Sequence, residues 1–301
     1  TLLEETRDHI EKHHSRGLFQ WFLRRLVIGQ VFPFPWRMRL ALLPVRAIRF
    51  LRFGFLLPKF AREMIELLPQ RLARGKVRAK RLAKGEGRGQ VGFIEGCVMQ
   101  VMFGDTNESS AELLNRDGWD VLTPKGQGCC GALHAHSGQL AKARDCARRN
   151  IAAFENEPLD AIIINAAGCG STLVEYGELL KDDPAWAERA EAFSAKVKDL
   201  VSWLDGSRFP VSGSGAKVTY HDACHLAHAQ AITKEPRELV KAKSVDEFVE
   251  LAESDLCCGS AGSYNLTEPE MANRLQTRKV QNIIDSGDRK STRLNSSHVK
   301  R

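Results

Sequence analysis

The chain has 301 residues, of which 43% are hydrophobic, with 24 Gly, 11 Pro and 8 Cys. This composition is that of an ordinary globular protein of about two domains, and it excludes collagen, a long coiled coil and general disorder. Eight cysteines are too few for a secreted scaffold held together by disulfides, and no signal-peptide pattern opens the sequence. We therefore expect a reducing, cytoplasmic location.

The formal net charge of +7 is unevenly distributed. Residues 1–90 carry 20 Lys and Arg against 7 Asp and Glu, and between Glu11 and Glu63 there is no acidic residue at all. Arg and Pro interrupt this aromatic-rich stretch too often for a membrane span. We expect residues 1–90 to form a basic helical arm and linker, ending in a solvated helix and Gly-rich link at 71–90. Its segment 16–62 would pack on the body, contact a partner subunit or lie on an anionic membrane surface; nothing beyond charge indicates nucleic-acid binding.

From residue 91 onward, short apolar segments alternate with longer amphipathic ones, which predicts a parallel α/β layer. A helical stretch at 184–205 and a linker at 212–215 interrupt this pattern before it restarts. Thr106 or Asp105 is the expected N-cap of the first helix. The expected strands are 91–96, 119–122, 159–165, 217–221 and 248–251, and the expected helices are 106–117, 133–154 and 268–284.

The cysteines repeat with this pattern. Cys97 and Cys224 are 127 residues apart, whereas Cys129 and Cys130 recur 128 residues later as Cys257 and Cys258. Two copies of one cysteine motif, each placed after a strand, are hard to attribute to packing alone. We therefore predict two homologous cysteine-rich α/β domains in tandem, at residues 91–211 and 212–287, preceded by the basic helical arm.

Four cysteines of the first half, Cys97, Cys129, Cys130 and Cys169, fall in loops around predicted strand ends, where ligands collect in parallel α/β layers. Glycines beside Cys129 and Cys130 let the backbone approach a bulky anion, and the following helix start favours thiolates. Adjacent cysteines cannot readily chelate one small ion, so the pattern favours an iron–sulfur cluster over zinc, whose sites commonly use C-x₂₋₄-C spacing. Zinc and a strained disulfide between the adjacent cysteines remain alternatives.

The second half supplies Cys224, Cys257 and Cys258 as metal ligands, with His221 and His225 on either side of Cys224. Each histidine could ligate the metal, donate a hydrogen bond to a thiolate or cap the backbone. We rank the hydrogen-bonding role first.

Two further histidines, His134 and His136, follow Cys130 in the first half. They are candidates for tuning a cluster or for a proton path, or are ordinary side chains of a helix start. Cys146 lies in the middle of a predicted helix and has no counterpart in the second half, so we predict a structural role for it.

The repeat predicts a fourth cysteine of the second site near position 297, where the sequence has Ser297. Residues 288–301 are polar and aperiodic and resemble a translated sequencing adaptor, so we expect a non-native tail. The second site would then be one ligand short. Thr1 is not an initiator residue, and we expect that further sequence precedes it.

Six segments together resemble the iron–sulfur subunits of bacterial glycolate oxidase (glycolate dehydrogenase), a family with paired cysteine-rich (CCG) domains. Lactate-utilisation iron–sulfur proteins and heterodisulfide reductase B subunits are more distant relatives. The resemblance covers about residues 1–287 and rests on the segments GFIEGCVMQVMFGDTN, PKGQGCCGALHAHSG, ARRNIAAF, NAAGCGSTLVEYG, YHDACHLAHAQ and LCCGSAGSYNLTEPEMA.

The resemblance implies an iron–sulfur cluster of the [4Fe–4S] type in this chain. It also implies partner subunits that carry FAD and oxidise glycolate, electron transfer toward a quinone, and a place on the cytoplasmic face of the inner membrane. A ferredoxin-like domain with C-x₂-C-x₂-C-x₃-C-P runs is implied upstream of Thr1. Heterodisulfide reductase relatives end each motif with C-x-x-C, and Ala166 at the first of these positions is consistent with the glycolate branch.

We therefore expect an electron-transfer subunit of an oxidoreductase complex. The sequence has no Gly-rich dinucleotide fingerprint and no nucleophile with a base, so hydride and acyl transfer have no visible site. Two alternatives stay open: a site that reduces thiols or disulfides, as in the distant relatives, and a zinc-stabilised scaffold for the flavoprotein.

Overall fold

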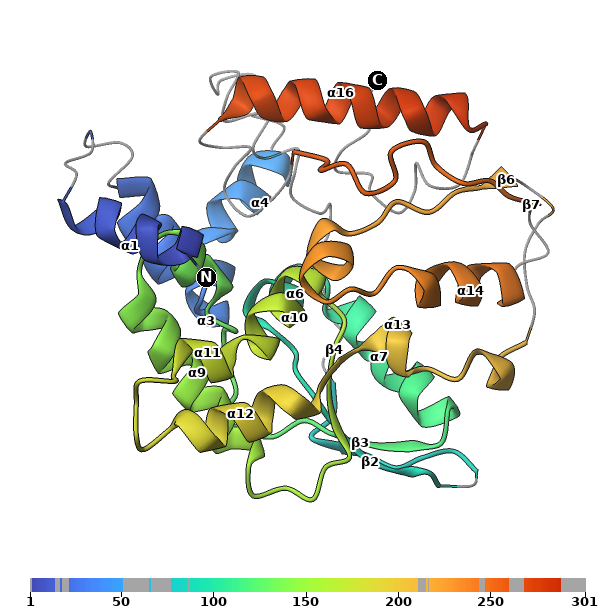
Figure 1. Ribbon diagram of the computed structural model, residues 1–301, viewed down its shortest axis with the longest axis horizontal. Helices are drawn as coiled ribbons and strands as arrows, with labels where there is room; N and C mark the ends of the chain where they lie inside the picture. The colour runs from blue at the N-terminus through green and yellow to red at the C-terminus, as the bar shows by residue number, and fades with distance from the viewer. Residues whose placement is uncertain are drawn as a thin grey trace. The chain divides into compact units, whose positions relative to one another are not determined.

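The structure is a computed structural model. It describes residues 2–13, 17, 22–50, 65, 77–85, 87–210, 215, 217–243, 247–259 and 268–287. The chain divides into two compact units, Thr1–Lys198 and Asp199–Arg301, each of which is considered by itself. Figure 1 shows the helices and strands along the chain.

A sheet with the strand order β1-β3-β2-β4-β5 forms the centre of the first unit. β2 pairs in parallel with β3 and with β4, so that Val91 lies opposite both Val121 and Ala161. β1 runs antiparallel to β3 at one edge. The parallel pairings confirm the predicted α/β fold, and the antiparallel β1 at the edge was not predicted. The strands are β1 (Lys80–Arg81), β2 (Gly89–Phe93), β3 (Trp119–Leu122), β4 (Ala161–Ile164) and β5 (Val197–Asp199).

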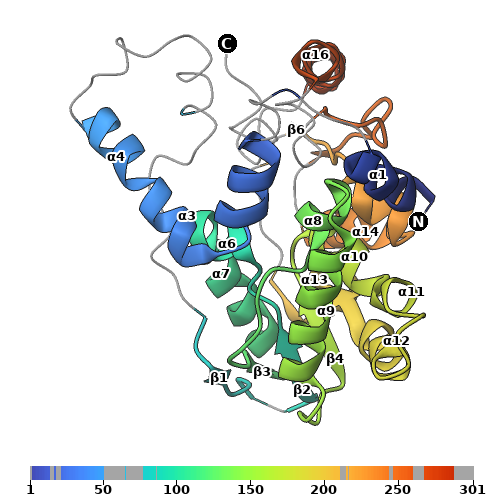
Figure 2. The same cartoon turned by 90° about the vertical axis from the view of Figure 1, so that its left-hand side faces the viewer.

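Helices cover both faces of this sheet. Figure 2 shows α7 on one side of the strands, with α9 and α12 on the other. All four residues of β4 are buried, as expected for a central parallel strand. Ile162 and Ile164 pack in one core with Ile151 of α9 and Phe193 of α12. The helices are α6 (Cys97–Met102), α7 (Gly104–Arg116), α8 (Ala132–His136), α9 (Leu140–Phe154), α10 (Ala167–Val174), α11 (Tyr176–Leu179) and α12 (Ala187–Lys196).

Residues 2–13 and 22–50 of the basic arm are mostly helical. They contain α1 (Leu2–His13), a π-helix (Leu23–Val31), α3 (Pro35–Ala41) and α4 (Leu43–Phe50). Pro35 occupies the first turn of α3, where a missing N–H costs nothing. Among the described residues, no helix is both long and apolar enough to cross a membrane. Residues 51–64 and 66–76 of the arm lie outside the described residues.

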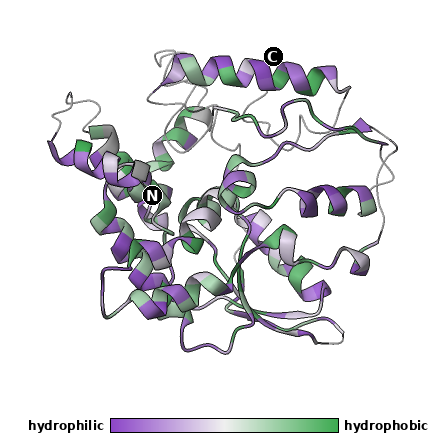
Figure 3. Ribbon diagram, viewed as in Figure 1, coloured by the Kyte–Doolittle hydropathy of each residue, from purple (hydrophilic) through white to green (hydrophobic). Residues whose placement is uncertain are grey.

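The second unit has a two-stranded parallel sheet and several helices. β6 (Lys217–Val218) pairs with β7 (Glu247–Phe248). Figure 3 shows that α16 (Pro269–Asp285) is largely hydrophilic with interspersed hydrophobic residues. The remaining elements are α13 (Leu200–Trp203), a 3₁₀ turn (Gly206–Arg208), a π-helix (His225–Ala229) and α14 (Lys234–Lys243).

Two helix predictions were wrong in detail. The helix predicted at 133–154 is divided into α8 and α9, because the chain turns at Gly138 with a φ of 75°. A Cβ there would lie 2.5 Å from the backbone oxygen of Arg7, so only glycine fits at this turn. Helix α7 begins at Gly104 after Phe103, which makes no side-chain capping bond. The proposed caps, Asp105 and Thr106, therefore lie inside the helix.

Four other segments also differ from expectation. The stretch 184–205 contains the short strand β5 between α12 and α13. Lys80–Arg81 forms β1 and Gly89 begins β2, where a solvated helix and a linker were expected. The strands predicted at 217–221 and 248–251 have only two residues each, β6 and β7. Of the linker at 212–215, only Gly215 is described.

Candidate metal centre

The four cysteines predicted as ligands in the first half lie together. Cys97 begins α6 beyond the end of β2, and Cys169 lies in the first turn of α10 beyond the end of β4. Cys129 and Cys130 stand in the loop between β3 and α8. The Sγ atoms of Cys97 and Cys129 are 3.5 Å apart, and Cys129 and Cys169 lie close enough to Cys130 to lower its pKa. All are free thiols, so the disulfide alternative is not formed in this structure.

Burial and mutual hydrogen bonding set the acidity of these thiols. Cys97, Cys129 and Cys130 are each no more than 5% exposed. Hydrogen bonds from Cys129 and Cys169 hold the pKa of the Cys130 thiol well below its usual range, and the backbone N–H of Ala132 adds to this effect. The same hydrogen bonds, together with burial, raise the pKa values of Cys129 and Cys169. Cys130 is thus the favoured thiolate of the group, and thiolates are the form that ligates metals.

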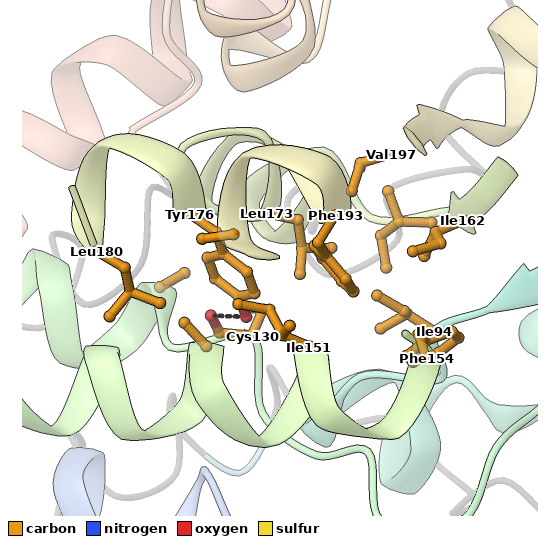
Figure 4. Close-up of a cluster of buried hydrophobic side chains, with 14 of the residues drawn as sticks. Ile94, Cys130, Ile151, Phe154, Ile162, Leu173, Tyr176, Leu180, Phe193 and Val197 are labelled. Atoms are coloured by element: carbon orange, nitrogen blue, oxygen red, sulfur yellow. Dashed lines mark hydrogen bonds between the residues drawn. The ribbon is translucent and has the colours of Figure 1, made fainter. Parts of the chain in front are cut away.

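A hydrogen-bond network holds the two adjacent cysteines in place. The Asn150 side chain on α9 accepts a bond from the backbone N–H of Gly128 and donates bonds to the Cys129 carbonyl oxygen and the Tyr176 hydroxyl oxygen. The Tyr176 hydroxyl donates to the Cys130 carbonyl oxygen at 2.7 Å, as Figure 4 shows. Asn150 and Tyr176 are fully buried, so these bonds are shielded from water.

Backbone N–H groups also point at the sulfur atoms. The amide of Gly131 donates to Cys129 Sγ at 3.4 Å, and in the second unit the amide of Gly259 donates to Cys257 Sγ at the same distance. Gly131 has a φ of 90°, and a Cβ there would lie 3.1 Å from a backbone oxygen of α9. Only glycine fits this turn without strain, which explains the residue after each Cys-Cys pair.

A fifth thiol belongs to this group, and sequence reasoning missed it. Cys146 of α9 packs in one buried cluster with Cys97 and Cys129. It also shares a hydrogen bond with Cys129, which lowers the pKa of the Cys146 thiol. The predicted role for Cys146 was structural, because the repeat gives it no counterpart. The sequence does not show which face of α9 meets the Cys-Cys turn, so it gave no signal of this contact.

The two histidines after Cys130 lie near the thiols. His134 is buried, which lowers its pKa, and its Nδ1 atom has no hydrogen-bond partner among the described residues. His136 has its Nδ1 atom 3.5 Å from Oε1 of Glu4 on α1, and its charge helps to lower the pKa of Cys130. Both histidines lie near the thiols, and a role in tuning a cluster stays a prediction.

In the second unit, Cys224, Cys257 and Cys258 also gather. Burial raises the pKa of Cys224, and the nearby Cys257 and Cys258 raise it further. His225 has its Nδ1 atom 3.5 Å from Cys224 Sγ, whereas His221 Nδ1 lies 3.0 Å from a backbone oxygen of the loop that precedes Cys257. His225 is therefore placed to bond a thiolate, and His221 ties two loops together.

Charged side chains hold the loops of the second site. Arg237 forms two 2.7 Å hydrogen bonds to the carboxylate of Asp222, two residues before Cys224, and another to the Ser254 hydroxyl. Burial alone would raise the pKa of Asp222, but the hydrogen bonds from Arg237 lower it. The buried Lys279 ammonium of α16 donates to the backbone oxygens of Glu253 and Ser254. Both loops that carry the thiols are thus fixed from α14 and α16.

The donor set fits an iron–sulfur cluster. The first site offers buried thiols with N–H donors to sulfur, and soft thiolate ligands of this kind suit iron–sulfur clusters. In the part of the chain that the structure describes, no group of three or more His, Cys, Asp or Glu side chains is arranged to hold a metal ion. The thiols instead contact one another directly.

A cavity of about 640 Å³ adjoins the first site. Gly96 and Gly128, the residues directly before Cys97 and Cys129, form part of its wall together with Arg149 of α9. The thiols are therefore buried, yet they lie one residue away from a space that opens to solvent.

The profile of the cysteine-rich (CCG) domain family matches residues 91–174 and 218–291, just over half of the chain. The protein is therefore a tandem cysteine-rich domain protein and belongs to the CCG family. Each matched region contains one of the two thiol groups.

Comparison with curated proteins places the chain beside glycolate oxidase iron–sulfur subunits. It is 39% identical over 295 residues to the probable glycolate oxidase iron–sulfur subunit of Bacillus subtilis, covering 93% of this chain and 66% of that protein. It is 33% identical over 292 residues to the glycolate oxidase iron–sulfur subunit of Escherichia coli, covering 95% of this chain and 68% of that protein. Lactate utilization protein A of Oceanobacillus iheyensis is 30% identical over 200 residues, covering 65% of this chain and 81% of that protein. These similarities confirm the resemblance drawn from the motifs.

Proposed function

We propose that the chain is the iron–sulfur electron-transfer subunit of a glycolate, or other 2-hydroxy acid, oxidase complex. A flavoprotein partner that carries FAD oxidises the substrate, and this chain passes the electrons toward a quinone-type acceptor. The observation that carries the proposal is the buried group of thiols drawn from separate loops of the first unit. The similarity to two glycolate oxidase iron–sulfur subunits over more than nine-tenths of the chain supports the choice of complex.

Four thiolates of the first site would hold a [4Fe–4S] cluster, namely Cys97, Cys129, Cys130 and Cys169. When bound, such a cluster accepts and releases single electrons at a potential set by charge, hydrogen bonds to sulfur and solvent exposure. The chain's own contribution is a thiol, Cys130, whose pKa its neighbours lower, and N–H donors that would offset the negative charge of bound sulfurs. Burial excludes water from the sulfurs.

The second site would use Cys224, Cys257 and Cys258, with His225 as the donor to Cys224 Sγ. The three thiols are half-buried, in contrast to the buried thiols of the first site. Because solvent exposure raises the polarity around a cluster, the two sites would differ in reduction potential. Two centres of different potential give an electron a direction of travel.

The basic arm would contact the flavoprotein partner. Several large hydrophobic side chains of its described part are exposed, alongside the exposed cations Arg39 and Arg46. Exposed apolar residues that gather in one region mark interaction surfaces. Arg37 stacks on Phe34 and Trp36, so one cation of the arm packs on its aromatic residues. The exposed hydrophobic residues of the arm are Phe22, Leu26, Trp36, Leu40 and Leu43.

Electron transfer from the partner tests the proposed function. The full chain, reconstituted anaerobically with iron and sulfide, is mixed with the FAD-containing glycolate oxidase subunits, and glycolate is added. We expect the visible charge-transfer absorption of the cluster to bleach only when glycolate and flavoprotein are both present. An oxidised cluster after flavoprotein reduction would contradict the proposal. Reduction of a disulfide substrate by the chain would favour the thiol–disulfide alternative instead.

Charge reversal tests the arm. We expect the double variant Arg39→Glu and Arg46→Glu to co-purify less with the flavoprotein, since the surface would then repel an acidic partner. The matched control reverses Arg116, an exposed cation of α7 outside the arm. Unchanged co-purification of the arm variant, or loss only of binding to anionic vesicles, would contradict a flavoprotein interface.

A further inference from the structure

Cys146 lies where a ligand of the first site would lie. It is 7% exposed and contacts Cys97 and Cys129 in one buried cluster. A buried cysteine in an apolar core would contact aliphatic side chains, whereas this cysteine contacts sulfur atoms.

The face of helix α9 on which Cys146 lies determines this contact. Ala143, Cys146 and Asn150 are spaced three and four residues apart, so they share one face of the helix. That face meets the Cys-Cys turn at both ends: Ala143 closely approaches Gly131, and Asn150 bonds the Cys129 carbonyl oxygen. Cys146, between them, is held against the turn. Its position is therefore determined by hydrogen bonds and close packing on each side.

We infer that Cys146 is a fifth thiol ligand of the cluster in the first domain. The inference rests on the proposed function, because it assumes that a cluster binds there. On binding, the thiol releases its proton to solvent and a sulfur–iron bond forms, with no change in the oxidation state of the sulfur. With five thiolates for four irons, two protein sulfurs would bind the same iron, and Cys129 and Cys146 already lie in one buried cluster.

Arg149 provides a compensating charge. It lies three residues after Cys146 on α9 and acts electrostatically to favour the Cys146 thiolate. Arg149 also lines the cavity beside the site. A fifth thiolate adds negative charge, which would lower the reduction potential of the cluster, and the guanidinium offsets part of that charge.

The second domain lacks this ligand. Gly259 approaches the backbone of Ala272 on α16 as Gly131 approaches that of Ala143 on α9. Counting three residues onward from each alanine aligns Cys146 with Leu275. The fifth thiol is therefore a feature of the first site alone, and it distinguishes the electronic properties of the two domains.

Substitution at Cys146 tests this inference in the full chain, reconstituted with iron and sulfide. Cys146→Ser keeps the size of the side chain, and Cys146→Ala avoids a buried hydroxyl if the first variant folds poorly. The matched control is Ala147→Ser, which adds an oxygen atom at a buried position on the same helix. The measurements are iron and sulfide content, the EPR spectrum of the reduced protein, the reduction potential and the rate of iron loss to a chelator.

We expect both Cys146 variants to change the EPR spectrum, to give a less negative potential and to lose iron about tenfold faster or more, a typical effect of altering metal surroundings. The Ala147→Ser control should match the wild type in iron and sulfide content, EPR spectrum, reduction potential and rate of iron loss. Wild-type spectra, potential and iron loss in both variants would overturn the inference while leaving the proposed function intact. A wild-type protein that takes up no iron and sulfide would overturn both.

Discussion

The Tyr176 hydroxyl is the most direct link between the protein core and the thiol loop. Tyr176→Phe removes a single oxygen atom and keeps the ring, which stacks on Phe193 with centroids 5.4 Å apart. The hydroxyl donates to the Cys130 carbonyl oxygen and accepts a bond from Asn150. Both bonds are lost in the variant, and Tyr176 is fully buried, so water cannot replace them.

The structure gives the expected size of this effect. The Cys130 carbonyl oxygen is left without its Tyr176 donor, whereas the Asn150 amide still bonds the Cys129 carbonyl oxygen. A buried polar group without a partner costs about 1 to 3 kcal/mol. With one such group and one weakened donor, we expect the free energy of unfolding of the first unit to fall by about 2 kcal/mol. If the turn holds the cluster, up to about 30-fold faster cluster loss would accompany this change.

Urea unfolding of the metal-free chain, followed by circular dichroism, measures the first quantity, and cluster release to an iron chelator measures the second. Tyr220→Phe is the matched control, since no hydrogen bond of the Tyr220 hydroxyl is found among the described residues. We expect the control to change stability by less than about 0.5 kcal/mol. Equal stability and equal cluster release in Tyr176→Phe and wild type would refute the claim that this network holds the Cys-Cys turn.

Three further predictions concern stability. Burial raises the pKa of Asp199 to about 6, so its folded form keeps a proton that the unfolded chain loses near the ordinary value of 3.8. The free energy of unfolding should therefore fall as the pH rises from about 4 to about 6. Asp199→Asn should not show this fall, and above pH 6 it should be more stable than the wild type by up to about 3 kcal/mol. Urea unfolding at a series of pH values measures both. Arg237→Leu should cost about 3 kcal/mol in the same assay because it leaves the buried Asp222 carboxylate unpaired; a loss below about 1 kcal/mol would contradict this. Gly131→Ala should lower the free energy of unfolding by about 2 kcal/mol, because Gly131 has a φ of 90° and a crowded position. Gly168→Ala should be neutral or stabilising, because Gly168 lies in α10 with open space around it. Equal melting temperatures for these two variants would refute the argument.

Periodic segments of the fold could be predicted from the sequence, and contacts between distant segments could not. β3 and α16 were placed within one or two residues, because their hydrophobic patterns are regular over the whole element. The break between α8 and α9 is a local helix end, in which Gly138 has a φ of 75° and the Gln139 amide bonds the His134 carbonyl oxygen. Gly138 is a sequence signal for such an end, and the prediction of one continuous helix overlooked it. The close approach of Gly138 to Arg7, more than a hundred residues earlier, left no such local signal.

The thiol site likewise has contacts that the sequence predicts and contacts that it does not. Cys97 and Cys169 could be brought together from sequence, because parallel strands end at one edge of a sheet. Cys146 could not, because its contact depends on which face of α9 meets the Cys-Cys turn. The neighbours of Cys224 could be named as candidates, but only the structure separates His225 at the thiol from His221 at a backbone oxygen.

Metal and sulfide analysis of the anaerobically reconstituted chain tests the central claim most directly. We expect iron and acid-labile sulfide in equal amounts, with an EPR signal on reduction. The serine variants of Cys97 and Cys130 should lose the cluster of the first site, and Thr172→Ser, a buried residue of α10 outside the thiol group, should retain it. Zinc without sulfide, or full iron and sulfide content in the cysteine variants, would contradict the assignment of these thiols to an iron–sulfur cluster.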